Sequence, residues 1–237
     1  ADAGQIGIVD PEHRLIALHL YDGLLKVLPA NLSTGQLKSE AFNIRLEELS
    51  ILDMVFLHNH LKPTIALLYK DDKDMRHLKT YELLLREKDL AEGPWGQQPN
   101  LEAGASSLIA LPFGGVLVLG EQSITYLSGT SFKTISVDFS CFKAHGKVDD
   151  DGTRWLLGDH NGWLRVLVLT VGDRGEMLSM RVEKLGRTTL PSAIVYLDDA
   201  TIFLGSCFGD SLLLRLNTEP DEETGSYITE LERRDNL

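Results

Sequence analysis

Short apolar runs, each cut by a turn and followed by an alternating run, recur along the chain. The last of them, residues 201–216, has a turn around Gly209 and Asp210, and then an alternating run in which Arg215 lies between two leucines. This pattern is typical of a β-hairpin, because apolar residues at every second position place one face of a strand in a core. Four earlier stretches have the same build, and they begin at Leu15, Thr64, Gly115 and Arg154.

The five hairpins begin at positions 15, 64, 115, 154 and 201; a further strand pattern precedes each of them, and another follows all but the second. A degenerate period of about 40 to 50 residues, with several short strands in each unit, is typical of propeller blades. The sequence therefore predicts an all-β protein, a β-propeller of four-stranded antiparallel blades with about five blades present. The expected blades span residues 5–46, 50–100, 106–139, 141–187 and 190–233.

Other folds fit the pattern less well. No run of ten or more residues has apolar positions at i, i+3 and i+4, which disfavours a helical protein, although residues 86–90 allow one short helix. Gly93 and Pro94, which follow residues 86–90, should end any strand ladder, and Trp95 is expected to pack against the blade edge. A β-sandwich stays open, but its roughly seven to nine strands would use only part of the chain.

We expect residues 1–237 to form a single propeller segment. The first unit begins on its innermost strand and the last unit ends on an outermost strand, with no sign that one end completes a blade begun by the other. The segment is therefore expected to be an arc of a larger ring. Such an arc would expose apolar blade faces at both ends.

The chain is acidic, with a net charge of −12. A protein of this charge repels phosphate backbones, and its densest basic pair, Arg233 and Arg234, lies among acids, so we expect little direct nucleic-acid contact. Cys141 and Cys207 lack metal-ligand spacing, and so few cysteines favour a reducing compartment. The longest apolar runs, such as residues 166–171, are too short to cross a bilayer, and the first residues lack the basic and apolar pattern expected of a secretory leader. We expect a soluble, intracellular protein without membrane contact.

Metal and cofactor motifs are not found. In the acidic run 149–152 the glycine comes fourth, whereas a calcium-binding EF-hand loop needs it sixth, and the run 71–74 carries Lys73 among its acids. These runs are predicted to be solvated turns. Neither of the glycine-rich nucleotide-binding patterns occurs. We therefore predict no metal and no cofactor.

Candidate catalytic groups are also weak. Ser140, His145 and Asp149 are the candidates for a nucleophilic triad, but no G-x-S-x-G pattern surrounds the serine. The inner strands offer Asp53 as their one mid-strand carboxylate, whereas glycoside hydrolysis needs two. Trp155 and Trp163 flank the fourth hairpin turn, and we expect them to be packed or partly exposed residues of the blade, with stacking on a ligand as the alternative. No catalytic residue is predicted.

Several strings go beyond a fold signal. IGIVDPEHRLIALHLYDGLLKVLP, FNIRLEEL, REKDLAEGPW, FGGVLVLGEQSITY and YLDDATIFLGSCFGDSLLLRLN closely resemble the first propeller of the family of large damaged-DNA-binding subunits. That family supplies the adaptors of cullin-4 RING ubiquitin ligases. The resemblance covers essentially the whole chain. The splicing factor 3b propeller subunit and the large cleavage-and-polyadenylation subunit share the architecture.

The resemblance implies a non-enzymatic scaffold in DNA repair and protein ubiquitination, present in nucleus and cytoplasm. The chain would supply five blades of the first seven-bladed ring in a three-propeller protein. In the family, the first and third propellers form a cleft for substrate receptors, which present WD-repeat domains or helical motifs, and the second propeller holds cullin-4. Damaged DNA is recognised there chiefly by a partner subunit. The alternatives are a propeller subunit of an RNA-processing complex and a stand-alone propeller lectin or hydrolase.

The resemblance also places receptor docking on the fifth unit. Tyr196, Asp198 and Asp199 match the turn after its inner strand, and Cys207 and Phe208 match the tip of its hairpin. The family has Asn at the position of Asp199 and an Arg-Leu pair at the tip, so a positive charge is missing here. Strand alternation places the two turns on opposite rims of the blade. For each residue, ordinary turn chemistry is the alternative interpretation.

Overall fold

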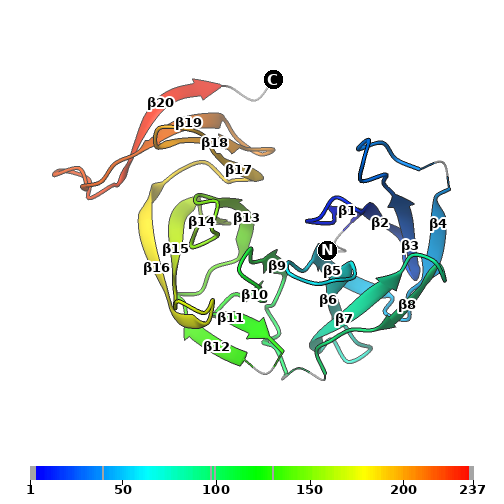
Figure 1. Cartoon of the computed structure of the whole chain (residues 1–237). Coiled ribbons are helices and arrows are strands. Elements are labelled where there is room, and N and C mark those ends of the chain that lie inside the picture. The colour runs from blue at the N-terminus through cyan, green and yellow to red at the C-terminus, as the bar shows by residue number, and fades with distance from the viewer. Residues whose placement is uncertain (1–3, 39, 97, 99, 130, 235–237) are drawn as a thin grey trace. The chain divides into compact units, whose positions relative to one another are not determined.

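The computed structural model describes residues 4–38, 40–96, 98, 100–129 and 131–234. Within these residues the chain forms twenty strands and no helix, so no helix there could cross a membrane. The strands make five antiparallel sheets of four strands, and in each sheet the strands lie side by side in chain order (Figure 1). The predicted all-β propeller architecture of four-stranded blades is thereby confirmed. We refer to the sheets as blades 1 to 5.

Blades 1 to 3 occupy the first part of the chain. Blade 1 consists of β1 (Ile6–Val9), β2 (Leu15–Tyr21), β3 (Leu24–Pro29) and β4 (Phe42–Arg45). Blade 2 consists of β5 (Ser50–Phe56), β6 (Thr64–Lys70), β7 (Arg76–Leu84) and β8 (Asp89–Glu92). Blade 3 consists of β9 (Ser107–Ala110), β10 (Val116–Leu119), β11 (Ser123–Ser128) and β12 (Ser131–Ser136).

Blades 4 and 5 complete the series. Blade 4 consists of β13 (Phe142–Lys147), β14 (Arg154–Asp159), β15 (Trp163–Val171) and β16 (Met177–Arg187). Blade 5 consists of β17 (Ala193–Tyr196), β18 (Thr201–Gly205), β19 (Ser211–Leu216) and β20 (Ile228–Arg234).

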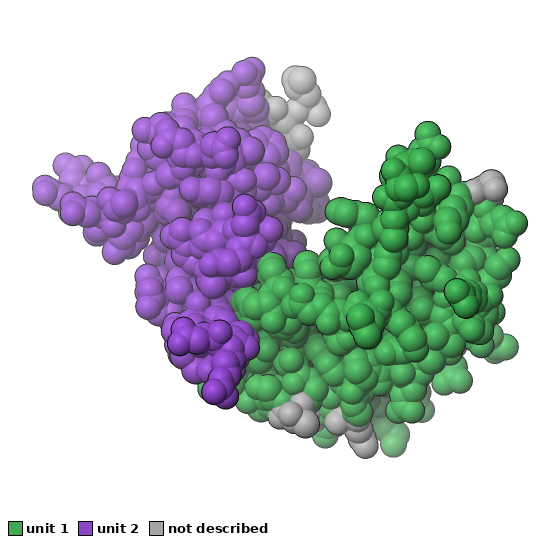
Figure 2. Space-filling model, viewed as in Figure 1, with its two compact units in different colours: residues 1–134 green, residues 135–237 purple. Residues whose placement is uncertain are grey.

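The chain divides into two compact units, residues 1–134 and residues 135–237, with the boundary inside β12 (Figure 2). Unit 1 holds blades 1 and 2 and most of blade 3, and unit 2 holds blades 4 and 5. The structure describes each unit by itself. That both units belong to one propeller segment over residues 1–237 stays a prediction.

Apolar side chains hold neighbouring blades together within each unit. In unit 1, one core joins Leu25 and Val27 of blade 1 to Ile65 and Leu67 of blade 2. Strand β6 is buried on both faces because blades lie on either side of it, which explains its unbroken apolar run. In unit 2 the core combines residues of blades 4 and 5. Its buried members are Leu156, Leu164, Leu185, Ile194, Ile202, Leu204, Leu212 and Leu214.

The first strand of each blade lies next to the first strand of its neighbour. This holds for β1, β5 and β9 in unit 1 and for β13 and β17 in unit 2. Strands β13 and β17 can lie this close because of a glycine: a Cβ on Gly146 of β13 would lie 2.6 Å from the carbonyl oxygen of Ile194 in β17. Adjacent first strands in four-stranded sheets are the arrangement of propeller blades around an axis.

The second blade differs from one expectation. Residues 85–88 form a turn and not a helix, and the polar segment after them, β8, pairs with β7. The predicted packing of Trp95 is confirmed, because this side chain is buried in the core between blades 2 and 3. Gly93 is required next to it, since a Cβ there would lie 2.2 Å from the Thr80 hydroxyl oxygen.

Candidate protein-interaction surfaces

The two predicted docking turns lie at opposite ends of one strand. Residues 197–200 connect β17 to β18, and residues 206–210 connect β18 to β19. Since both connections join antiparallel neighbours, each turn lies at a different end of β18. The expectation that they occupy opposite rims is confirmed. The five predicted residues therefore form two separate surfaces.

The first turn combines structural and exposed residues. Asp199 and Ala200 both have positive φ angles, 53° and 57°, as in the hairpin turns that match strand twist. The Tyr196 ring packs against the core of unit 2, and its hydroxyl oxygen accepts a hydrogen bond from the Ala200 N–H at 3.2 Å. Tyr196 thus has a structural role in the turn. Asp198 and Asp199 are exposed to solvent.

The second turn presents an apolar tip on a fixed backbone. The Phe208 side chain is 82% exposed, and Cys207 is also exposed. Two serine hydroxyl oxygens hold the backbone of this turn: the Cys207 N–H donates to Ser192 Oγ at 3.0 Å, and the Phe208 N–H donates to Ser206 Oγ at 3.3 Å. An exposed aromatic ring on a preorganised turn is a favourable anchor, because binding then costs little ordering entropy.

Blade 4 extends both surfaces within unit 2. The Thr188 N–H donates to the Gly162 carbonyl at 2.7 Å, and Thr189 Oγ1 donates to the Asp210 carbonyl at 2.7 Å, which joins the loops of both blades on the side of Phe208. We define the Phe208 rim as residues 137–141, 160–162, 188–192 and 206–210. The opposite side, which we call the acidic rim, consists of residues 148–153, 172–176, 197–200 and 217–227.

The two rims differ in charge. The acidic rim carries eleven acidic residues and one basic residue, Arg174. Its Asp149 is paired with Arg154, and that guanidinium holds the pKa of the carboxyl below its ordinary value. The Phe208 rim carries Asp138 and Asp210, and each is ion-paired, the first with Lys184 at 3.1 Å and the second with Arg233 at 3.0 Å. The rim with the exposed phenylalanine is therefore nearly neutral.

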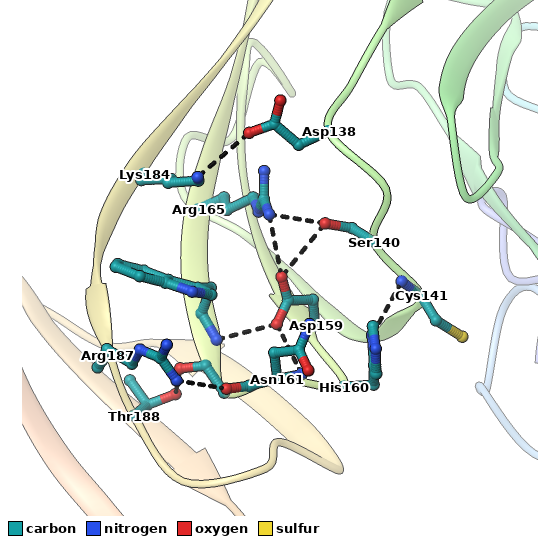
Figure 3. Close-up of polar contacts among 12 residues, drawn as sticks. Asp138, Ser140, Cys141, Asp159, His160, Asn161, Arg165, Lys184, Arg187 and Thr188 are labelled. Carbon is teal, nitrogen blue, oxygen red and sulfur yellow. Dashed lines mark hydrogen bonds and ion pairs between the residues drawn. The ribbon is translucent and has the colours of Figure 1, made fainter.

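A buried polar network lies beneath the Phe208 rim (Figure 3). Arg165 Nη2 donates to Ser140 Oγ at 2.6 Å and to Asp159 Oδ2 at 3.1 Å. The other carboxylate oxygen of Asp159 accepts the N–H groups of Asn161 and Trp163, at 2.9 and 3.0 Å, so it fixes the turn between β14 and β15. Arg165 and Asp159 are both buried, and Arg165 Nε has no hydrogen-bond partner among the described residues.

Sequence reasoning did not single out this network. The available signals were an arginine inside the apolar run of β15 and an aspartate directly before the His160–Gly162 turn. An arginine and an aspartate at such positions are equally typical of residues exposed to solvent. The third member, Ser140, lies in the loop before β13, and its hydroxyl donates to Asp159 Oδ2 at 3.3 Å.

The catalytic candidates are separated or engaged elsewhere. Ser140 belongs to the buried network, whereas the His145 ring contacts Trp155 with centroids 6.0 Å apart, and Asp149 pairs with Arg154. The described contacts therefore do not bring these three side chains together as a triad.

Asp53 serves to join two blades. Its Oδ2 accepts the N–H of Leu108 in β9 at 2.7 Å, and its Oδ1 accepts the N–H of Met54 at 2.8 Å. Burial raises the pKa of this carboxyl to about 6, despite the two backbone donors that lower it. The arrangement accounts for a lone carboxylate on an inner strand.

The acidic runs make local turn contacts. Asp71 accepts the N–H groups of Lys73 and Met75, both at 2.9 Å, and contacts His77 at 2.8 Å, while Asp151 accepts the N–H of Thr153 at 2.9 Å. Across residues 4–38, 40–96, 98, 100–129 and 131–234, no three His, Cys, Asp or Glu side chains gather as metal ligands.

The two tryptophans of blade 4 have different environments. Trp155 is buried, and its indole N–H donates to the Gly152 carbonyl at 2.8 Å, which agrees with a packing role. Trp163 is half-buried and carries two cations on its ring, with Arg187 4.7 Å and Lys184 5.4 Å from the centroid.

Comparison with known proteins gives a family and several relatives. The family model described as RSE1/DDB1/CPSF1 first beta-propeller matches residues 1–235. DNA damage-binding protein 1 of Solanum lycopersicum is 54% identical over 238 residues, and DNA damage-binding protein 1a of Arabidopsis thaliana is 53% identical over 238 residues. DNA damage-binding protein 1 of Oryza sativa subsp. japonica is 52% identical over 239 residues. Each match covers 100% of this chain, but the chain spans only about a fifth, 21 to 22%, of the relatives' length.

Proposed function

The chain belongs to the RSE1/DDB1/CPSF1 first-propeller family, and from this premise we propose that it is a non-enzymatic scaffold that binds other proteins. The observation that carries the proposal is the Phe208 turn. A large apolar side chain stands 82% exposed on a backbone held by hydroxyl groups, at a rim whose acids are neutralised by ion pairs. Exposed aromatic anchors with a polar surround are the usual centres of binding energy in protein interfaces.

In this proposal the Phe208 rim receives substrate receptors of a cullin-4 RING ubiquitin ligase, which serves DNA repair and protein ubiquitination. The receptors would present helical motifs or WD-repeat domains, and cullin-4 would bind another propeller of the parent protein. The names of the relatives support the link to DNA damage. The net charge of −12 favours contact with proteins over direct contact with DNA. The protein would act in nucleus and cytoplasm.

Cys207 and Phe208 would contribute the apolar contact of this surface. Tyr196, Asp198 and Asp199 lie at the other end of β18, so a receptor seated on the Phe208 rim does not reach them with the same segment. We propose that Asp198 and Asp199 contact a different segment or a different partner, while Tyr196 acts mainly by holding the turn through its bond to Ala200.

The test is Phe208→Asp in the full-length protein, followed by capture of tagged receptors from cell extract. We expect loss of receptor capture with an unchanged melting temperature, because the ring contacts solvent and not the core. The matched control is Leu61→Asp, since the Leu61 side chain is fully exposed in unit 1. Unchanged capture of all receptors by the Phe208→Asp protein would reject the docking assignment.

Capture of untagged partners from cell extract, with the unmodified full-length protein as bait, distinguishes the alternative function. The family description also includes RSE1 and CPSF1, so an RNA-processing complex is the second candidate. Mass spectrometry of the proteins bound to the unmodified bait should find ubiquitin-ligase subunits. Splicing or polyadenylation factors in their place would favour the alternative.

A further inference from the structure

A cleft opens between the outermost strands of blades 4 and 5. The residues just before β20 approach β16, because the Tyr227 N–H donates to the Leu185 carbonyl at 2.7 Å. Gly186 permits this approach, since a Cβ there would lie 2.5 Å from Ser226 Oγ. A cavity of about 770 Å³ is lined by residues of both blades, and it reaches Thr189 of the Phe208 rim.

The cleft has an apolar floor and a basic mouth. Leu212 and Leu214 belong to the floor, and the charged residues of its lining are Lys184, Arg187, Arg233 and Glu230. Lys184 is paired with Asp138, and Arg233 with Asp210 and Glu230, so among the described residues Arg187 is the lining cation without a carboxylate partner. Such a cation in a concave site of a chain with net charge −12 attracts an acidic group specifically, because the surrounding field repels that group elsewhere.

Arg187 is the cation best placed for an incoming anion. Its guanidinium lies 4.7 Å from the Trp163 ring centroid, and Nη1 donates to the Asn161 carbonyl at 3.2 Å (Figure 3). These contacts orient the group without neutralising its charge. Lys184 lies over the same ring but is shared with Asp138, and Arg233 is shared with Glu230 and Asp210. An orientation fixed by an aromatic ring favours bidentate binding of a carboxylate.

We propose that this cleft binds an acidic peptide segment of a partner protein. Asp or Glu side chains of the segment contact Arg187 and the neighbouring cations, and an apolar side chain between them packs on the apolar lining, where Ile228 is half-buried. The apolar floor favours a peptide over inorganic phosphate or a nucleic-acid backbone, since neither of these offers an apolar group to cover it. The proposal does not depend on receptor docking at Phe208, although the cleft reaches the same rim.

The test begins with a random dodecapeptide library displayed on phage and selected on the full-length protein. Selection is repeated on the Arg187→Glu protein, so that peptides which bind elsewhere are subtracted. We expect the peptides specific to the unmodified protein to carry Asp or Glu around an apolar residue. Enrichment of basic or uncharged peptides, or the same peptides from both selections, would overturn the proposal.

A fluorescein-labelled version of the enriched peptide then measures affinity by anisotropy. Arg187→Glu and the milder Arg187→Gln should each weaken binding about tenfold or more, as expected for loss of a hydrogen bond between charged groups. Arg181→Glu in β16 and Arg234→Glu in β20 are matched controls, because neither residue lines the cleft. Phe208→Asp should leave this affinity unchanged, which separates the cleft from the docking surface. Equal loss with the controls and with Arg187→Glu would contradict the proposal.

Trp163 supplies a direct readout. Trp95 and Trp155 are buried, so Trp163 is the tryptophan of this chain that should respond to a peptide in the cleft. The change in intrinsic fluorescence of the full-length protein on peptide addition should therefore be smaller in the Trp163→Phe protein, although the peptide still binds. An equal change with and without this substitution would place the peptide outside the cleft.

Discussion

The Phe208 rim and the acidic rim of unit 2 belong to the same two sheets, yet they differ in chemistry. One carries an exposed aromatic side chain and acids paired with cations, and the other carries a large excess of carboxylates. In blade 5 the two strands that connect the rims, β18 and β19, both bury every second residue over their central part. The comparison shows that the fold sets where the two surfaces lie, while the turns decide what each can bind.

Aspartate has a different role on each side. On the acidic rim, Asp151 and Asp221 accept N–H groups of residues two or three positions later, so they stabilise their own turns. On the Phe208 side, buried Asp159 binds Arg165 and holds the turn from below. All three aspartates hold their own turns, and Asp159 differs from the other two because it is buried and bound to Arg165.

The largest expected difference concerns stability. Asp159→Ala leaves Arg165 buried without its partner, and we expect a loss of about 3–5 kcal/mol in the free energy of unfolding of unit 2. Asp149→Ala removes a solvent-exposed ion pair on the acidic rim and should cost only about 0.2–1 kcal/mol. Urea unfolding of both variants measures the difference. Equal losses would show that the buried network does not support the Phe208 rim.

A carboxylate away from both rims gives the next effect. The folded-state pKa of Asp53 is raised to about 6, above its ordinary value of 3.8, so the folded protein binds this proton more tightly than the unfolded chain does. Its contribution to stability is therefore lost as the pH rises from about 4 to about 6, by up to about 3 kcal/mol. Asp53→Asn should remove this loss, and the stability of the variant relative to the unmodified protein should increase across that range. A pH-independent difference would contradict the assigned cause.

A smaller effect compares the rims in binding. Phe208→Ala should weaken receptor binding about 30-fold, or about 2 kcal/mol, as for a central aromatic anchor. The double variant Asp198→Asn/Asp199→Asn should change the affinity less than about twofold, because its turn lies at the other end of β18. Surface plasmon resonance with a purified receptor measures both. A larger effect of the double variant would assign docking to the acidic rim.

Much of the fold was predictable because the hairpins repeat. The alternating runs around residues 15, 64, 115, 154 and 201 identify the central strands of all five blades, since these strands are buried and must be apolar on at least one face. Strand β8 was missed because its sequence, DLAE, is short and polar at the outer edge of blade 2, where burial imposes no pattern. Residues 86–88 before it are exposed, so burial imposes no pattern there either, and the sequence allows a short helix where the structure has a turn.

The sites were predictable only in part. Alternation alone placed Asp198 and Phe208 on opposite rims, because strand direction fixes that relation. The Arg165 network and the basic cleft were not predictable, since each combines residues from separate elements whose spacing in the sequence carries no signal. Arg187 and Arg233 line one cavity although they lie on strands of different blades.

Hydrogen–deuterium exchange of the full-length protein, with and without a bound receptor, tests whether receptors dock on the Phe208 rim. Receptor binding should slow exchange in residues 188–192 and 206–210 and leave residues 148–153 and 197–200 unchanged. Protection confined to residues 148–153 and 197–200 would contradict it.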